Sequence, residues 1–100
     1  MPSNFNYTQI DEIFHSRIRL AILSILLTVE KAEFSFLKEK TKATDGNLGA
    51  HLKKLEDAEY IQIEKRFIDR KPVSFYNITE KGRKSIENYL TLLEQLFGKT

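Results

Sequence analysis

Cysteine is absent from this sequence of 100 residues, which excludes disulfide bonds, thiolate metal sites and cysteine nucleophiles. Long apolar runs are absent as well. The longest, residues 20–23 and 25–27, are far shorter than the roughly 20 residues of a membrane-spanning helix. Residues 1–15 have neither the basic start nor the apolar stretch of a secretory signal. We therefore expect a cytoplasmic protein.

Signatures of catalysis and of ligand binding are also scarce. His15 and His51 are the only histidines, and two distant histidines do not form a metal site without further ligands. The sequence has no glycine-rich phosphate loop and no evident set of nucleophile, histidine and carboxylate. We expect a protein that is not an enzyme and that holds no metal and no cofactor. Nothing in the sequence identifies a small-molecule effector.

Composition and charge describe a folded domain with two basic segments. Hydrophobic residues make up 41% and charged residues 30% of the chain, and there are only two prolines. A chain of this length and composition is expected to form one domain, residues 1–100. The net charge is only +2, but residues 38–54 and 65–71 carry +3 each, while the rest sums to −4. Positive charge confined to two segments favours nucleic-acid binding.

Hydrophobic periodicity predicts helices near both ends of the chain. Residues 7–14 have the spacing of a short amphipathic helix, and residues 17–30 that of a longer helix with two apolar sides. One of those sides should face the core, and the other needs cover from further protein. Thr79 is expected to cap a last helix that stops at Gly98. Its apolar stripe is Ile86, Tyr89, Leu90, Leu93, Leu96 and Phe97.

Two further helices are predicted in the middle of the chain. Ser35 is expected to cap a short helix over residues 36–41. A turn over residues 42–44 follows, and Thr44 can cap the next helix, residues 45–59. The buried stripe of that helix is Leu48, Leu52, Leu55 and Ala58. Two helices joined by a turn of about three residues form a helix-turn-helix.

The period of the apolar residues then changes to two, which predicts β-structure. Residues 61–67 alternate, residues 68–72 break the alternation with charges and a proline, and residues 73–78 alternate again. This pattern indicates an antiparallel hairpin with a basic tip. The expected fold class is therefore mainly α with a small antiparallel β-hairpin.

Three stretches of sequence carry a resemblance to a known family. They are LGAHLKKLEDAEYI at residues 48–61, RKPVSFYNIT at residues 70–79 and TEKGR at residues 79–83. Their order and spacing over residues 17–96 resemble the winged helix-turn-helix domain of small MarR-like and ArsR-like bacterial and archaeal transcriptional regulators. The resemblance implies that residues 45–59 are a DNA recognition helix and that the hairpin is the wing.

Three positions depart from the family pattern. Gly49 and Ala50 stand just before the His-Leu pair, where the family usually has a serine and often an arginine. Glu59 replaces the usual glycine at the end of the helix. These departures bear on direct base readout rather than on the fold. Metal-sensing relatives use cysteine or histidine clusters, which this sequence lacks, so we do not expect a metal-sensing role.

The expected DNA contacts follow from helix geometry and charge. With Leu48 inward, Asn47 faces outward, where its amide can bond adenine, and the lysines can reach guanine or phosphate. Arg70 at the hairpin tip suits a minor groove. The candidates in the recognition helix are Thr44, Gly46, Asn47, Ala50, His51, Lys53 and Lys54. The candidates in the wing are Lys65, Arg66, Arg70 and Lys71.

Surplus apolar residues predict a homodimer, because a domain this small has too little core to bury them all. We expect the terminal helices and the outer side of the first long helix to form the interface. Its candidate residues are Ile10, Ile13, Phe14, Leu20, Leu23, Leu27, Tyr89, Leu93, Leu96 and Phe97. The predicted partners are thus double-stranded DNA and a second copy of the chain.

Two other functions remain open at this point. One is a winged-helix module that binds protein and not DNA, and such a module would more often expose apolar residues on the wing and the recognition helix. The other is an RNA-binding module, which would more often carry aromatic residues on an open sheet face.

Overall fold

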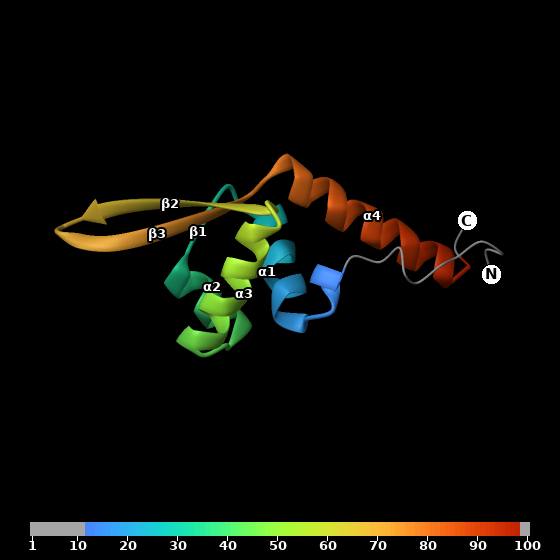
Figure 1. The fold of residues 1–100 in the computed structure, drawn as a ribbon, viewed down its shortest axis with the longest axis horizontal. Helices are drawn as coiled ribbons and strands as arrows, with labels where there is room; N and C mark the ends of the chain where they lie inside the picture. The colour runs from blue at the N-terminus through green and yellow to red at the C-terminus, as the bar shows by residue number, and fades with distance from the viewer. Residues whose placement is uncertain (1–11, 99–100) are drawn as a thin grey trace.

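The computed structural model describes residues 12–98, which form a helical body, a hairpin and a long C-terminal helix (Figure 1). The hairpin and the last helix project from opposite sides of the body, and the molecule measures 57 × 24 × 21 Å. In chain order the elements are η2 (Glu12–Phe14), α1 (Arg17–Thr28), β1 (Ala32–Glu33), α2 (Phe34–Thr41), α3 (Asp45–Asp57), β2 (Ile61–Ile68), β3 (Lys71–Ile78) and α4 (Glu80–Leu96). Within residues 12–98 no helix is long and apolar enough to cross a bilayer.

The core is built where α1, α2 and α3 meet the sheet. Its fully buried side chains are Ile22, Leu23, Leu26, Leu37, Leu48, Leu52, Leu55 and Ile61. The predicted stripe of α3 is therefore confirmed, with Ala58 only half-buried. The expectation that Leu23 lies on the outer side of α1 is wrong, because the body covers α1 on both apolar sides. Leu20 and Leu27 are half-buried and pack against the same core.

Side-chain caps fix the start of three of the helices. Ser16, Thr44 and Thr79 each accept a hydrogen bond from the backbone N–H three residues on, at 3.2, 3.2 and 2.9 Å. The predicted cap at Ser35 is wrong. The helix α2 already begins at Phe34, and Glu33 precedes it without a side-chain cap. The reason is that Glu33 belongs to β1, so the strand leads directly into the helix.

The described sheet has three antiparallel strands in the order β1-β3-β2, not the hairpin alone. The added strand, β1, pairs Ala32 with Tyr76 and Glu33 with Phe75. A strand of two residues has no periodicity that a sequence can show.

The hairpin turn is tighter than predicted. Only Asp69 and Arg70 form it, with φ values of 51° and 66°, as in a two-residue type I′ turn. Pro72 does not break β3, since it lies opposite Phe67 in the strand pair. In such a hairpin the second pair from the turn is not hydrogen-bonded, so the missing N–H of Pro72 faces away from β2.

The connection from α3 to β2 depends on one residue with a left-handed backbone. Glu59 has φ of 65°, so α3 ends at Asp57 and not at residue 59. The N–H groups of Glu59 and Tyr60 donate to the carbonyls of Glu56 and Leu55, at 2.8 and 3.0 Å, which is a Schellman motif. Gly82 packs against the same segment, and a Cβ there would clash with the Tyr60 carbonyl oxygen.

The last helix, α4, rests on the body only near its start. Ile86 is buried and Tyr89 stacks on Phe14 at 4.7 Å between ring centroids. Farther along, Leu90, Leu96 and Phe97 are exposed by 49%, 38% and 73%. The helix is followed by Gly98 with φ of 73°, as predicted. The predicted helix over residues 7–14 lies mostly outside the described residues, of which only the 3-10 turn Glu12–Phe14 belongs to it.

Candidate nucleic-acid interface

The exposed face of α3 has the orientation expected of a recognition helix. Thr44, Gly46, Asn47, Ala50, Lys53 and Lys54 are all exposed, whereas His51 is half-buried. A Cβ at Gly46 or Gly49 would have no heavy atom within 4 Å. Packing within residues 12–98 therefore does not require glycine at either position. The two glycines leave an open strip along α3 into which another molecule can approach closely.

Ion pairs divide the basic residues of this surface into two groups. Lys53 pairs with Asp57 at 2.8 Å, Arg66 with Glu64 at 2.6 Å, and Lys38 with Asp45 at 2.7 Å. Asp57 raises the pKa of Lys53 by hydrogen bonding, and Arg66 lowers the pKa of Glu64 in the same way. The group without an ion pair within residues 12–98 includes Lys54, Lys65, Arg70 and Lys71. These unpaired charges are the ones free to neutralise phosphate.

A second basic cluster lies at the junction of α1 with the helix-turn-helix. Arg17, Lys40 and Lys42 line one hollow together with Thr44 and Asn47. None of these three cations forms an ion pair with a described residue. The sequence analysis counted Lys40 and Lys42 in the basic segment 38–54 but assigned none of the three cations to the DNA contacts. Lys40 lies in α2, Lys42 in the turn that follows it, and Arg17 at the start of α1. Only the fold brings Arg17 beside the turn, some 25 positions later in the chain.

His51 is held from behind by a buried arginine that the sequence analysis also missed. Arg19 of α1 is only 8% exposed. Its Nε donates to the Ile13 carbonyl at 2.7 Å, and its Nη1 lies 3.1 Å from His51 Nδ1. Burial, and then the charges of Arg19 and Lys54, lower the pKa of His51. The ring is therefore neutral at physiological pH, in agreement with its position among cations, which disfavour a further positive charge.

The wing combines cations with exposed apolar residues. The strand register places Lys65 and Phe67 on the same sheet face as the buried Ile61, so this face looks toward α3. Phe67 is 79% exposed and Ile68, on the opposite face, is 43% exposed. Lys65 and Ser74 of the wing line one hollow with Gly49 and Lys53 of α3. Wing and recognition helix thus border a common groove.

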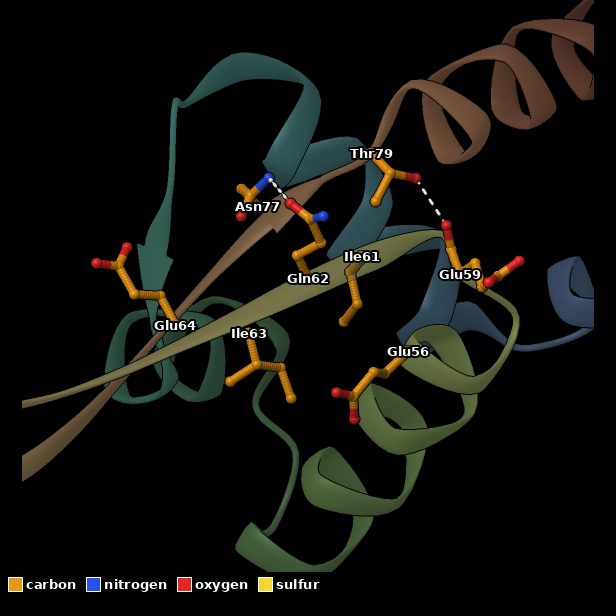
Figure 2. A pocket seen from close by; sticks show the side chains of 8 residues that line it. All are labelled: Glu56, Glu59, Ile61, Gln62, Ile63, Glu64, Asn77 and Thr79. Carbon is orange, nitrogen blue, oxygen red and sulfur yellow. Dashed lines mark hydrogen bonds between the residues drawn. The ribbon is translucent and has the colours of Figure 1, made fainter.

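A different hollow, at the end of α3, has the opposite charge. Figure 2 shows Glu56, Glu59 and Glu64 around Ile61 and Ile63, beside the outer edge of β2. The Thr79 hydroxyl donates to the Glu59 carbonyl at 2.7 Å and closes one end of this hollow. Glu59 and Glu64 are paired with Lys81 and Arg66, so Glu56 is the carboxylate of this hollow that has no ion pair among residues 12–98. An unpaired carboxylate repels phosphate.

A helix-turn-helix, a three-stranded sheet and a projecting basic hairpin together define a winged-helix DNA-binding domain. Residues 18–97 match the family described as winged helix DNA-binding domain, and the chain belongs to that family. The resemblance to winged-helix transcriptional regulators, inferred from the sequence, is thereby confirmed, as is the fold class.

Several known proteins are similar to this chain. An uncharacterised protein of Methanocaldococcus jannaschii is 42% identical over 85 residues, which cover 85% of this chain and 92% of that protein. A structure of a transcriptional regulator homologue from Pyrococcus horikoshii is 30% identical, with a TM-score of 0.79, over 86% of this chain and 85% of that one. An ArsR family transcriptional regulator shares the fold at 22% identity and a TM-score of 0.62, over 88% and 86% of the two chains.

Proposed function

We propose that this chain is a sequence-specific regulator of transcription that binds double-stranded DNA as a homodimer. Helix α3 enters the major groove, and the tip of the β2–β3 hairpin contacts the minor groove or the backbone. The observation that carries this proposal is the groove bordered by α3 and the wing, which brings Lys53 and Lys65 together from separate elements. Of these two cations, Lys65 has no carboxylate partner among residues 12–98, whereas Lys53 is paired with Asp57.

Each part of the surface has its own role in this proposal. Asn47 contacts a base from the first turn of α3, because its amide can bond adenine with two hydrogen bonds. Arg17, Lys42 and Lys54 neutralise backbone phosphates, which supply affinity without sequence preference. Arg70, at the tip of the wing, reaches the narrow groove, where the negative potential is strongest.

The dimer is supported by apolar surface that residues 12–98 leave uncovered. Leu90, Leu96 and Phe97 are exposed, and Tyr89 and Leu93 are half-buried beside them on α4. Leu20 and Leu27 of α1 remain candidates, since both are only half-buried. Ile13, Phe14 and Leu23 are already covered by their own chain and offer little surface. Ile10 lies outside the described residues. A two-fold dimer would place two α3 helices on half-sites about one duplex turn apart.

Binding to a mixed-sequence duplex across a range of salt concentrations tests the DNA function. We expect affinity that falls steeply as salt rises, because counterions are released from the neutralised phosphates. Absence of binding at low salt would contradict the proposal.

Sedimentation equilibrium tests the dimer, with Leu90→Glu as the informative variant. Leu90 is half-exposed in the monomer, so a charge there splits a dimer without unfolding the domain. Thr91→Glu adds the same charge to an exposed polar position of α4 and should leave the mass unchanged. A monomer mass for the unmodified protein at micromolar concentration would refute the dimer.

The protein-interaction alternative has one observation in its favour, the exposure of Phe67 and Ile68 on the wing. It requires that duplex DNA does not bind, so the salt series above also decides this question. The RNA alternative has less support. Phe75 is the only aromatic residue on the outer face of the described sheet, and Lys31 and Arg66 cover its ring at 5.1 and 5.3 Å. Excess single-stranded RNA as a competitor separates the two nucleic acids.

A further inference from the structure

Arg19 is a buried cation without a carboxylate partner among residues 12–98. Buried arginines are rare and are ordinarily paired, since a charge removed from water must be compensated. Within residues 12–98 its hydrogen-bond partners are one backbone carbonyl, that of Ile13, and one imidazole nitrogen, that of His51. Neither group carries a negative charge.

The contact between Arg19 and His51 fixes the chemical state of the histidine. A guanidinium has only donors, so His51 Nδ1 must accept the hydrogen bond from Nη1. An imidazole that accepts at Nδ1 is neutral, and its proton lies on Nε2. The lowered pKa of His51 agrees with this state. Protonation would set two donors against each other and would add a charge beside Arg19 and Lys54.

The position of His51 on α3 determines where its Nε2–H group points. In an imidazole the two ring nitrogens point to nearly opposite sides, so Nε2 points away from the buried Arg19. His51 is half-buried, lies on α3 one turn after Asn47 and one turn before Lys54, and has no recorded partner for Nε2 among the described residues. The donor is thus directed to the exposed side of the recognition helix.

We propose that Arg19 is a positioning residue that locks His51 as an Nε2–H donor for a backbone phosphate of DNA. This inference rests on the proposed DNA-binding function. The phosphate supplies a negative charge that no residue from 12 to 98 places beside Arg19, and it does so through the ring of His51. Donation by a cation to Nδ1 polarises the imidazole, which strengthens the donor at Nε2. The contact differs from those of the lysines because it is directional and neutral.

Long-range proton–nitrogen NMR of the imidazole rings tests the lock directly. In the free protein at neutral pH we expect His51 to show the Nε2–H form alone. Saturation with a mixed-sequence duplex about two helical turns long should move the Nε2 proton signal downfield. His15, exposed and outside the proposed contact, serves as the reference in the same spectra. An Nδ1–H form in the free protein, or an unchanged Nε2 signal on bound DNA, would overturn the inference.

Substitutions measure what the contact contributes to binding. His51→Ala should weaken duplex binding about tenfold, the usual effect of losing a hydrogen bond to a charged group. His51→Gln keeps an N–H near the Nε2 position and should restore most of the affinity. His15→Ala is the matched control and should bind like the unmodified protein. Equal binding by His51→Ala and the unmodified protein would contradict the proposal.

Arg19→Met separates positioning from simple packing. Methionine fills a similar volume but cannot donate, so His51 should show a mixture of both tautomers in a folded protein. A purely structural Arg19 would change the melting temperature and leave the tautomer as it is, which would refute the positioning role. If the unmodified protein binds no duplex at low salt, the proposed function itself fails. If it binds and only the His51 results are negative, this inference alone fails.

Discussion

The helical body buries its apolar residues, whereas the two projecting arms, the β2–β3 hairpin and α4, leave large apolar residues exposed. In the body, α1, α2 and α3 bury Ile22, Leu26, Leu37 and Leu52 almost completely. In the arms, the wing leaves Phe67 exposed by 79%, and the end of α4 leaves Phe97 exposed by 73%. Figure 1 shows that the two arms extend in opposite directions from the body.

This contrast separates the residues that specify the fold from those available for binding. The body buries its apolar side chains against one another. The arms expose apolar side chains, and the residues beside each arm indicate the kind of partner that would cover them. Lys65, Arg70 and Lys71 lie in the same hairpin as the exposed Phe67 and have no carboxylate partner among residues 12–98, which suits DNA. Around the exposed residues of α4 lie further leucines, which suit a second copy of the chain.

The difference between body and arms is tested most strongly by the same substitution, leucine to alanine, made once in each region. Leu26→Ala, in the core of the body, should lower the free energy of unfolding by about 2–5 kcal/mol at every protein concentration. Leu90→Ala, on α4, should lower the apparent stability only where the dimer is populated. Urea unfolding at low and high protein concentration measures both. Equal, concentration-independent losses would mean that α4 belongs to the body.

Within the DNA surface, base readout should be distinguishable from phosphate contact. Asn47→Ala should cost about 1–3 kcal/mol on a selected site and much less on random duplex, because only a base contact depends on sequence. Selection of binding sites from a random duplex pool, followed by anisotropy titrations, provides both numbers. The same loss on both duplexes would remove Asn47 from base readout.

In the wing, Arg66 forms an ion pair within residues 12–98 and Arg70 does not, so their alanine variants should differ, by a smaller amount, in the salt dependence of DNA binding. Arg70→Ala should reduce the slope of log affinity against log salt by about one, the value for one phosphate contact. Arg66→Ala should reduce it less, because Arg66 already neutralises Glu64 at 2.6 Å. A larger effect from Arg66 than from Arg70 would show that the ion pair opens on DNA.

The smallest predicted effect lies at the junction between body and wing. Glu59 has φ of 65°, where glycine is free of the strain that other residues bear. Glu59→Gly should therefore stabilise the domain by about 0.5–1 kcal/mol in thermal or urea unfolding. Its pair with Lys81, at 3.4 Å and exposed, offsets little of this. A loss of stability would mean that this ion pair outweighs the backbone strain.

Much of the fold could be predicted from the sequence because its signals are local. The stripe Leu48, Leu52 and Leu55, the caps Thr44 and Thr79 and the alternation from Ile61 onward each depend on neighbouring residues. What the sequence could not show depends on pairing across the chain. The short strand β1, the tight turn that keeps Pro72 in β3, and the burial of Leu23 follow from contacts with distant segments.

The candidate site divides in the same way. The outward residues of α3 follow from helix geometry, and the structure confirms their exposure. The contacts of Arg17 and Arg19 with the helix-turn-helix join segments far apart in sequence. The ion pairs that occupy Lys53 and Arg66 are local, with Asp57 four residues on and Glu64 two residues before, but they depend on side-chain conformations that the sequence does not show. A count of charges in the sequence does not distinguish the cations that form ion pairs from those that do not.

The most direct test of the central claim is the mass of the complex between this protein and duplex DNA. Sedimentation with separate detection of protein and labelled duplex, at low salt and micromolar concentration, gives the number of chains per duplex. We predict two chains on a duplex about two helical turns long, with release of the protein as salt rises. One chain per duplex would contradict the dimer, and unbound duplex at low salt would contradict the DNA-binding function itself.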